Sequence, residues 1–146
     1  MITFRLKIDR TLLSLSRFRA TYPLAMRRAV RRGAGAALRG IVSGNPVDTG
    51  RLRAGWSGAG AELGVGVPAQ ERFPDPSYYG APPRGRDFSQ FPWSEIVGPN
   101  QVTFIARNNV PYGVEVEARR PFVLLGLESA RSEFEAAVVS EWNGLK

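Results

Sequence analysis

The sequence "LAMRRAVRRGAGAALRGIV", residues 24–42, decides the fold, because its apolar residues recur at the three- and four-residue spacing of an amphipathic helix. The apolar side of this helix gathers Met26, Val30, Ala34, Ala37 and Ile41. The basic side gathers Arg28, Arg32 and Arg39, with Arg27 and Arg31 at its borders. Pro23 suits the first turn, and Gly44 followed by Pro46 suits the end, so we predict a helix over 24–43.

This helix needs a packing partner. Gly33, Gly35 and Gly40 each cost roughly 1 kcal/mol of helix propensity relative to alanine, so tertiary or subunit packing must stabilise the helix. Three roles are open for its cations: a solvated face, contact with acidic surfaces of neighbouring subunits, or contact with passing DNA. The residues concerned are Arg27, Arg28, Arg31 and Arg32.

Alternation of apolar and polar residues predicts a strand before the helix and another after it. Residues 2–8 form the first strand, and Asp9 can cap a short helix or a lead-in over 10–20. After Trp56, the glycine-rich segment 57–67 alternates at three apolar positions, which indicates an approach followed by a strand. These positions are Leu63, Val65 and Val67.

The remainder of the chain predicts more strands and a second long helix. Residues 95–108 read as two strands joined at 98–100, and residues 112–118 read as a further strand with Glu115 and Glu117 on one side. Pro121 then opens a helix. Its apolar stripe comprises Leu124, Leu127, Ala130, Phe134, Ala137 and Val138. This order predicts an α+β domain, in which an antiparallel or mixed sheet is covered on one face by the two long helices.

The chain length and composition narrow the function. A chain of 146 residues fits one domain, 1–146, and residues 68–95 hold six of the eleven prolines, so we predict an extended loop or arm insertion there. The absence of cysteine and histidine removes thiolate chemistry, the commonest metal ligand and the commonest general base, and with them most enzyme classes, so we expect no cofactor and no metal. The amino-terminal segment is charged and no apolar run is long enough for a membrane helix, which predicts a protein that is cytoplasmic at synthesis.

The net charge of +7 is unevenly distributed. Residues 1–58 carry twelve Lys/Arg against two Asp, whereas residues 59–146 carry eight Lys/Arg against eleven Asp/Glu. The basic half could therefore attract the acidic half of a neighbouring subunit or a nucleic acid.

The tripeptide Asp48-Thr49-Gly50, within "NPVDTGRLRAGW" at residues 45–56, is also found around the catalytic aspartate of retroviral-type proteases. Such a site needs two carboxylates that share a proton on an apolar floor. Here Arg51 and Arg53 would keep those carboxylates ionised, which makes the protease the weakest alternative. A turn is the simpler interpretation. Its residues are Pro46, Val47, Asp48, Thr49, Gly50 and Leu52.

The segment at 45–56 resembles the "P-V-D-T-G-x-L-R" signature of small tail-completion and neck proteins of long-tailed bacteriophages, which also occur in prophages and gene-transfer particles. Two later segments resemble the same family in the expected order. "VPYGVEVE", residues 110–117, is similar to its tyrosine-small-x-x-valine-glutamate strand, and "RRPFVLLGLESA", residues 119–130, is similar to its proline-phenylalanine helix opening. The chain departs from the family pattern at Gly113, where alanine is usual, and directly after Glu117.

The resemblance implies a non-enzymatic, structural virion protein of the head–tail junction, located in the neck or at the top of the tail. It implies a homo-oligomeric ring, commonly of six subunits, around the DNA channel and in contact with connector, neck and tail proteins. Candidate interface residues are Arg27, Arg28, Arg31, Arg32, Arg53, Phe73, Tyr78, Tyr79, Phe88, Phe91, Trp93, Tyr112, Glu115 and Glu117. The aromatics of 68–95 either pack within a loop or belong to an arm that docks on a neighbouring ring. The alternative outside this class is a nucleic-acid-binding protein that uses the basic helix.

Overall fold

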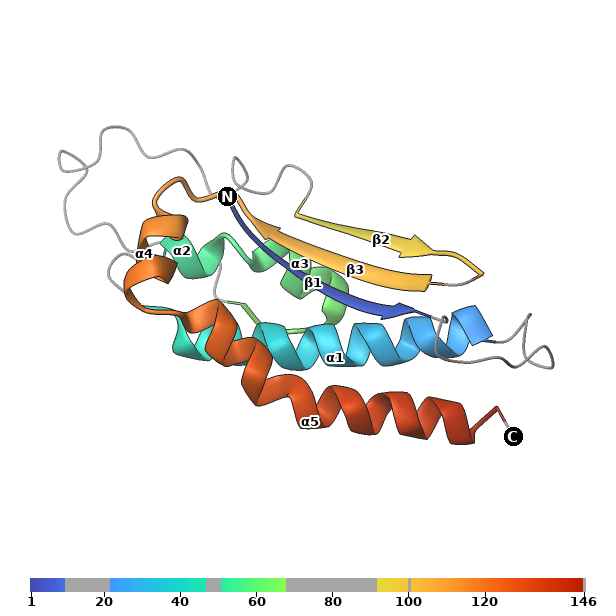
Figure 1. Ribbon diagram of the computed structural model, residues 1–146. Coiled ribbons are helices and arrows are strands. Elements are labelled where there is room, and N and C mark those ends of the chain that lie inside the picture. Colours follow the sequence, from blue (N-terminus) through green and yellow to red (C-terminus); the bar gives the residue numbers. More distant parts are fainter. Residues whose placement is uncertain (10–21, 47–50, 68–91, 100, 146) are drawn as a thin grey trace, which may run out of the picture.

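The computed structural model describes residues 1–9, 22–46, 51–67, 92–99 and 101–145 (Figure 1). The elements in chain order are β1 (Ile2–Asp9), α1 (Tyr22–Gly44), α2 (Arg51–Ala54), α3 (Ser57–Leu63), β2 (Trp93–Val97), β3 (Gln101–Asn108), α4 (Gly113–Arg119) and α5 (Phe122–Asn143). The predicted α+β class is confirmed: a three-stranded antiparallel sheet is combined with two long helices, α1 and α5, which pack together and on the sheet.

The sheet has the strand order β1-β3-β2, so β3 is the central strand. β1 pairs with β3 along its whole length, from Ile2 opposite Asn108 to Asp9 opposite Gln101. Because side chains alternate between the faces of a strand, Ile2 and Phe4 are buried while Arg5 is exposed. The predicted strand at 2–8 and the predicted strand pair within 95–108 are therefore confirmed.

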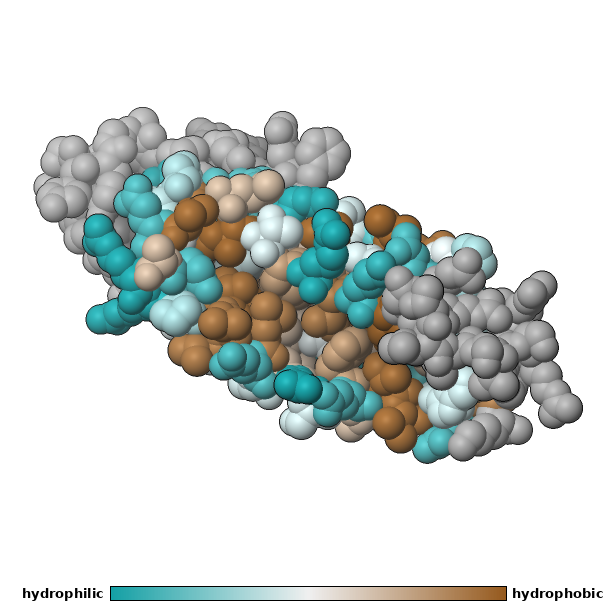
Figure 2. All heavy atoms as spheres, in the orientation of Figure 1, coloured by the Kyte–Doolittle hydropathy of each residue, from teal (hydrophilic) through white to brown (hydrophobic). Residues whose placement is uncertain are grey.

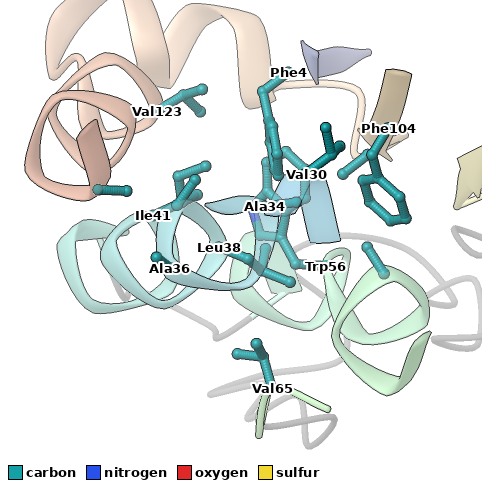
Figure 3. Close-up of a cluster of buried hydrophobic side chains, with 14 of the residues drawn as sticks. Phe4, Val30, Ala34, Ala36, Leu38, Ile41, Trp56, Val65, Phe104 and Val123 are labelled. Carbon is teal, nitrogen blue, oxygen red and sulfur yellow. The ribbon is translucent and has the colours of Figure 1, made fainter. Parts of the chain in front are cut away.

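α1 lies across one face of the sheet, and α5 runs antiparallel along α1 on the side away from the strands (Figure 1). The five residues predicted for the apolar side of α1 are all buried. Figure 3 shows that the core joins α1 to the sheet through Val30 and Phe104, to the segment after α1 through Trp56, and to α5 through Val123. Among the described residues, no helix is long and apolar enough to cross a membrane.

The glycines of α1 admit α5 of the same chain at close range. A Cβ at Gly40 would lie 2.7 Å from Ser129 Oγ, and one at Gly33 would overlap the Phe134 ring. On the other helix, a Cβ at Gly126 would lie 2.6 Å from the backbone nitrogen of Ile41. The packing partner required by the low helix propensity of α1 is therefore supplied within the chain.

Two predicted strands are wrong. In the segment 57–67, residues 57–63 form α3, which ends where Gly64 adopts a positive φ of 67°, and residues 65–67 follow without strand structure. Residues 113–119 form α4, so Glu115 and Glu117 do not lie on one side of a strand. Over seven residues the alternation of Val114 and Val116 fits a strand or a helix, and the close approach of Gly113 to Ile2 and Leu52 accompanies the helix.

Two further predictions need correction at their boundaries. The loop predicted over 68–95 is too long at its end, because β2 begins at Trp93. The rest of that prediction, over 68–91, lies outside the described residues, and so does the short helix or lead-in predicted over 10–20. The prediction that Leu124 belongs to the apolar stripe of α5 is wrong, because its side chain is 52% exposed. Val123 and Gly126 face α1 in its place.

Candidate functional site

The described parts of the segment that resembles the phage signature are residues 45–46, directly after α1, and residues 51–56, and we call them the corner. α1 ends at Gly44, Asn45 is buried, and the chain continues at Arg51 in the single turn of α2. Leu52 and Trp56 are buried, and the Trp56 ring lies 5.8 Å from the ring of Phe4. Of the residues predicted to form a turn, Pro46 and Leu52 are described, whereas Val47, Asp48, Thr49 and Gly50 lie outside the described residues.

A buried asparagine at the end of β3 holds this corner. The Asn108 side chain donates a hydrogen bond of 2.7 Å to the carbonyl of Leu52 and accepts one of 3.1 Å from the backbone N–H of Val110. Any side chain at Gly55 would overlap Asn108 Oδ1, so glycine is required there. Asn108 therefore ties the signature segment to the second segment of the resemblance, which begins at Val110.

The second segment contacts the first directly. Tyr112 precedes α4 as its N-cap residue, and Gly113 is buried at the start of that helix. A Cβ at Gly113 would lie 2.7 Å from Ile2 and 3.1 Å from Leu52. A small residue is therefore needed at this position for α4 to pack against β1 and the corner.

Glu117, in the second segment of the resemblance, bonds to the beginning of α5, which belongs to the third segment, 119–130. The Glu117 carboxylate accepts hydrogen bonds from the backbone N–H groups of Val123, at 2.9 Å, and Leu124, at 3.2 Å, and so caps α5. The three segments meet at one end of the molecule, where α2 and α4 lie in Figure 1. We call this end the corner assembly, and it comprises 45–46, 51–56, 108–113 and 117–126.

The basic helix forms a second cluster with side chains of β2, β3 and α3. Arg27 donates to Glu95 of β2 at 2.9 Å, and this hydrogen bond, with the attraction of that carboxylate, raises the pKa of Arg27. Arg31 pairs with Glu62 of α3, lies 3.5 Å from Glu95, and has its guanidinium 5.9 Å from the centre of the Phe104 ring. We call these five side chains the arginine cluster.

Two other arginines of α1 pair with carboxylates of α5. Arg28 pairs with Glu141 and Arg39 with Glu133, both at 2.8 Å. Arg32 is exposed and forms no ion pair with a described residue. Four of the five cations of the basic helix are therefore matched by carboxylates of the same chain, an arrangement that none of the three predicted roles includes.

The remaining candidate residues are dispersed. Trp93 stacks on Phe104 with ring centres 5.8 Å apart, Glu115 is exposed, and Tyr112 and Arg53 are half-buried. The other aromatics lie outside the described residues: Phe73, Tyr78, Tyr79, Phe88 and Phe91. No group of three or more potential metal ligands occurs in the part of the chain that the structure describes.

Sequence reasoning missed Asn108, Glu62 and Glu95. For Asn108 the available signal was a polar residue directly after the apolar run of a central strand, where a buried amide needs hydrogen-bond partners. For the glutamates, the signal was the charge difference between the halves of the chain, which had been assigned to contacts with other molecules.

No protein-family model matches this sequence, and comparisons with curated proteins and with solved structures found no significant similarity.

Proposed function

We propose that this chain is a structural subunit of the head–tail junction of a tailed bacteriophage or phage-derived particle. In this role it forms an oligomeric ring that completes the tail or joins it to the head connector around the DNA channel. The observation that carries the proposal is the corner assembly, in which all three segments that resemble the neck-protein family come together. Residues in those segments are matched to one another in shape, as Leu52 and Gly113 are.

The contacts around the signature favour a structural role for it. Leu52 and Trp56 contribute to the core, and Asn108 bonds the backbone beside them. Residues of the signature therefore hold α2 against the core and beside α4. A subunit that assembles into a ring needs such a fixed arrangement. The ion pairs of the basic helix reduce the charge that it offers to DNA, which counts against the nucleic-acid-binding alternative.

The proposal is tested in particles assembled without this chain. We expect negative-stain images to show filled heads and separate tails, and supply of the wild-type chain to restore joined particles. Labelled chain should be located at the neck. Heads joined normally to tails in its absence would exclude the proposed role.

The signature itself is tested by Asp48→Ala. We expect this variant to lose folding stability or ring assembly, because a turn that uses the aspartate as an acceptor loses about 0.5–2 kcal/mol when that acceptor is removed. The measurement is thermal unfolding together with joining of heads to tails. Peptide cleavage by the wild type that is blocked by pepstatin would instead support the aspartic protease alternative.

A further inference from the structure

A groove with an apolar floor and a basic rim opens beside the corner assembly, between the end of α1 and the α4–α5 joint. Its volume is about 620 Å³, and Phe122, Leu125 and Gly126 contribute to its lining. Leu125 is 58% exposed and the adjacent Leu124 is 52% exposed. Figure 2 shows apolar side chains gathered over the beginning of α5 on the visible face. Contiguous exposed apolar side chains of this kind mark interaction surfaces.

The rim of this groove carries positive charge that no carboxylate of the described residues pairs with. Arg119 and Arg120 line the groove, are exposed, and form no ion pair with any described residue. The nearest carboxylate in sequence, Glu117, is already engaged by the backbone of α5. A fitting partner therefore presents an apolar side chain together with a carboxylate.

The opposite end of α5 presents this combination. Ser132, Glu135, Ala136 and Val139 are all exposed and recur at helical spacing, so they form one outer stripe. Val139 is 57% exposed. Glu135 bonds only weakly to Arg131, because the two side chains are 62% and 80% exposed.

We infer that the groove of one copy receives the outer stripe of a second copy, with Val139 on the apolar floor and Glu135 between Arg119 and Arg120. Leu125 and Val139 are separated by about 21 Å along α5, at 1.5 Å per residue, so one copy can use both surfaces at once. The contact is head-to-tail, and it closes a ring if the rotation between copies allows. This inference rests on the proposed function and names the interface that would build its ring.

The test is charge exchange between the two surfaces. The groove variant carries Arg119→Glu with Arg120→Glu, and the stripe variant carries Glu135→Arg. We expect the purified full-length wild type to associate, and each variant alone to associate at least tenfold more weakly, as measured by light scattering after size-exclusion chromatography. An equimolar mixture of the two variants should recover association, because each reversed surface then meets its complement.

A matched control separates this effect from net charge. The double variant Arg5→Glu with Lys7→Glu reverses two other exposed cations, both on β1, and should associate like the wild type. Circular dichroism melting verifies that every variant folds. Association of the groove variant at wild-type strength, a mixture that stays monomeric, or a wild type that is monomeric at every concentration would overturn the inference.

The outcomes for the interface and for the proposed function are distinct. If the groove variant associates normally while particles that lack the chain fail to join heads to tails, the interface is wrong and the proposed function stands. If charge exchange governs association but particles without the chain are joined normally, the interface stands and the proposed function fails.

Discussion

The corner assembly and the arginine cluster both connect segments that are distant in sequence, but they do so by different physical means. The corner relies on fit: a buried tryptophan, a buried asparagine and glycines without room for a methyl group. The arginine cluster relies on charge, with two guanidinium groups and two carboxylates that solvent reaches in part. A small change in side-chain volume disrupts close packing, so the free energy of unfolding falls markedly. When an ion pair near solvent is broken, water hydrates both charged groups, so the free energy of unfolding falls less. The corner should therefore be the more sensitive of the two regions.

The largest effect is expected for Trp56→Ala in the corner. Trp56 has no exposed surface, so its truncation should lower the free energy of unfolding by about 3–5 kcal/mol. The matched control is Trp93→Ala, since Trp93 is half-buried on an edge strand and should cost about 1–2 kcal/mol. Urea unfolding monitored by circular dichroism measures both. Equal losses for the two tryptophans would show that the corner is not the more sensitive region.

A smaller effect is expected for Gly126→Ala at the crossing of α1 and α5. The new methyl group would meet the backbone of Ile41 and push the helices apart, at a cost of about 1–3 kcal/mol. Gly35→Ala is the control, because a Cβ there has no neighbour closer than 3.7 Å. This control should stabilise the protein by up to about 1 kcal/mol through helix propensity. Melting temperatures that move in the same direction for both variants would contradict the close crossing.

Long periodic segments could be predicted from sequence, and short ones could not. The apolar side of α1, from Met26 to Ile41, repeats over about four turns, and the alternation of β1 matches its pairing with β3, so both predictions are confirmed. α4 has only seven residues, and Val114 and Val116 fit a strand by propensity. Its helix is decided by distant contacts, such as that of Gly113 with Leu52, which no local pattern reports.

The candidate site divides in the same way. The sequence predicts a turn between Pro46 and Leu52, because proline, glycine and aspartate have local conformational preferences, and this stays a prediction because residues 47–50 lie outside the described residues. It did not predict that Asn108 bonds the corner, because one hydrogen-bond partner, the carbonyl of Leu52, is 56 residues away in sequence. The other partner, the N–H group of Val110, is local and by itself indicates no contact with the corner. The charge difference between the two halves of the chain predicted that basic and acidic side chains attract one another. It could not say whether they pair within one chain or between chains, because Coulomb attraction is the same in both cases.

The smallest effect is expected in the arginine cluster. Glu95→Gln keeps the shape of the side chain and removes the charge that faces Arg27 and Arg31. We expect a loss of about 1 kcal/mol, because the carboxylate is nearly buried while its partners are 43% and 24% exposed and therefore reach water.

Glu133→Gln is the control for this change, since its pair with Arg39 is about half exposed on both sides and should contribute less than about 0.5 kcal/mol. Urea unfolding at low and high salt separates the two, because screening should weaken the exposed pair more than the one at Glu95. If Glu95→Gln costs as much as Gly126→Ala, charge holds β2 and α1 together as firmly as fit holds the corner, and the two regions are not different in kind.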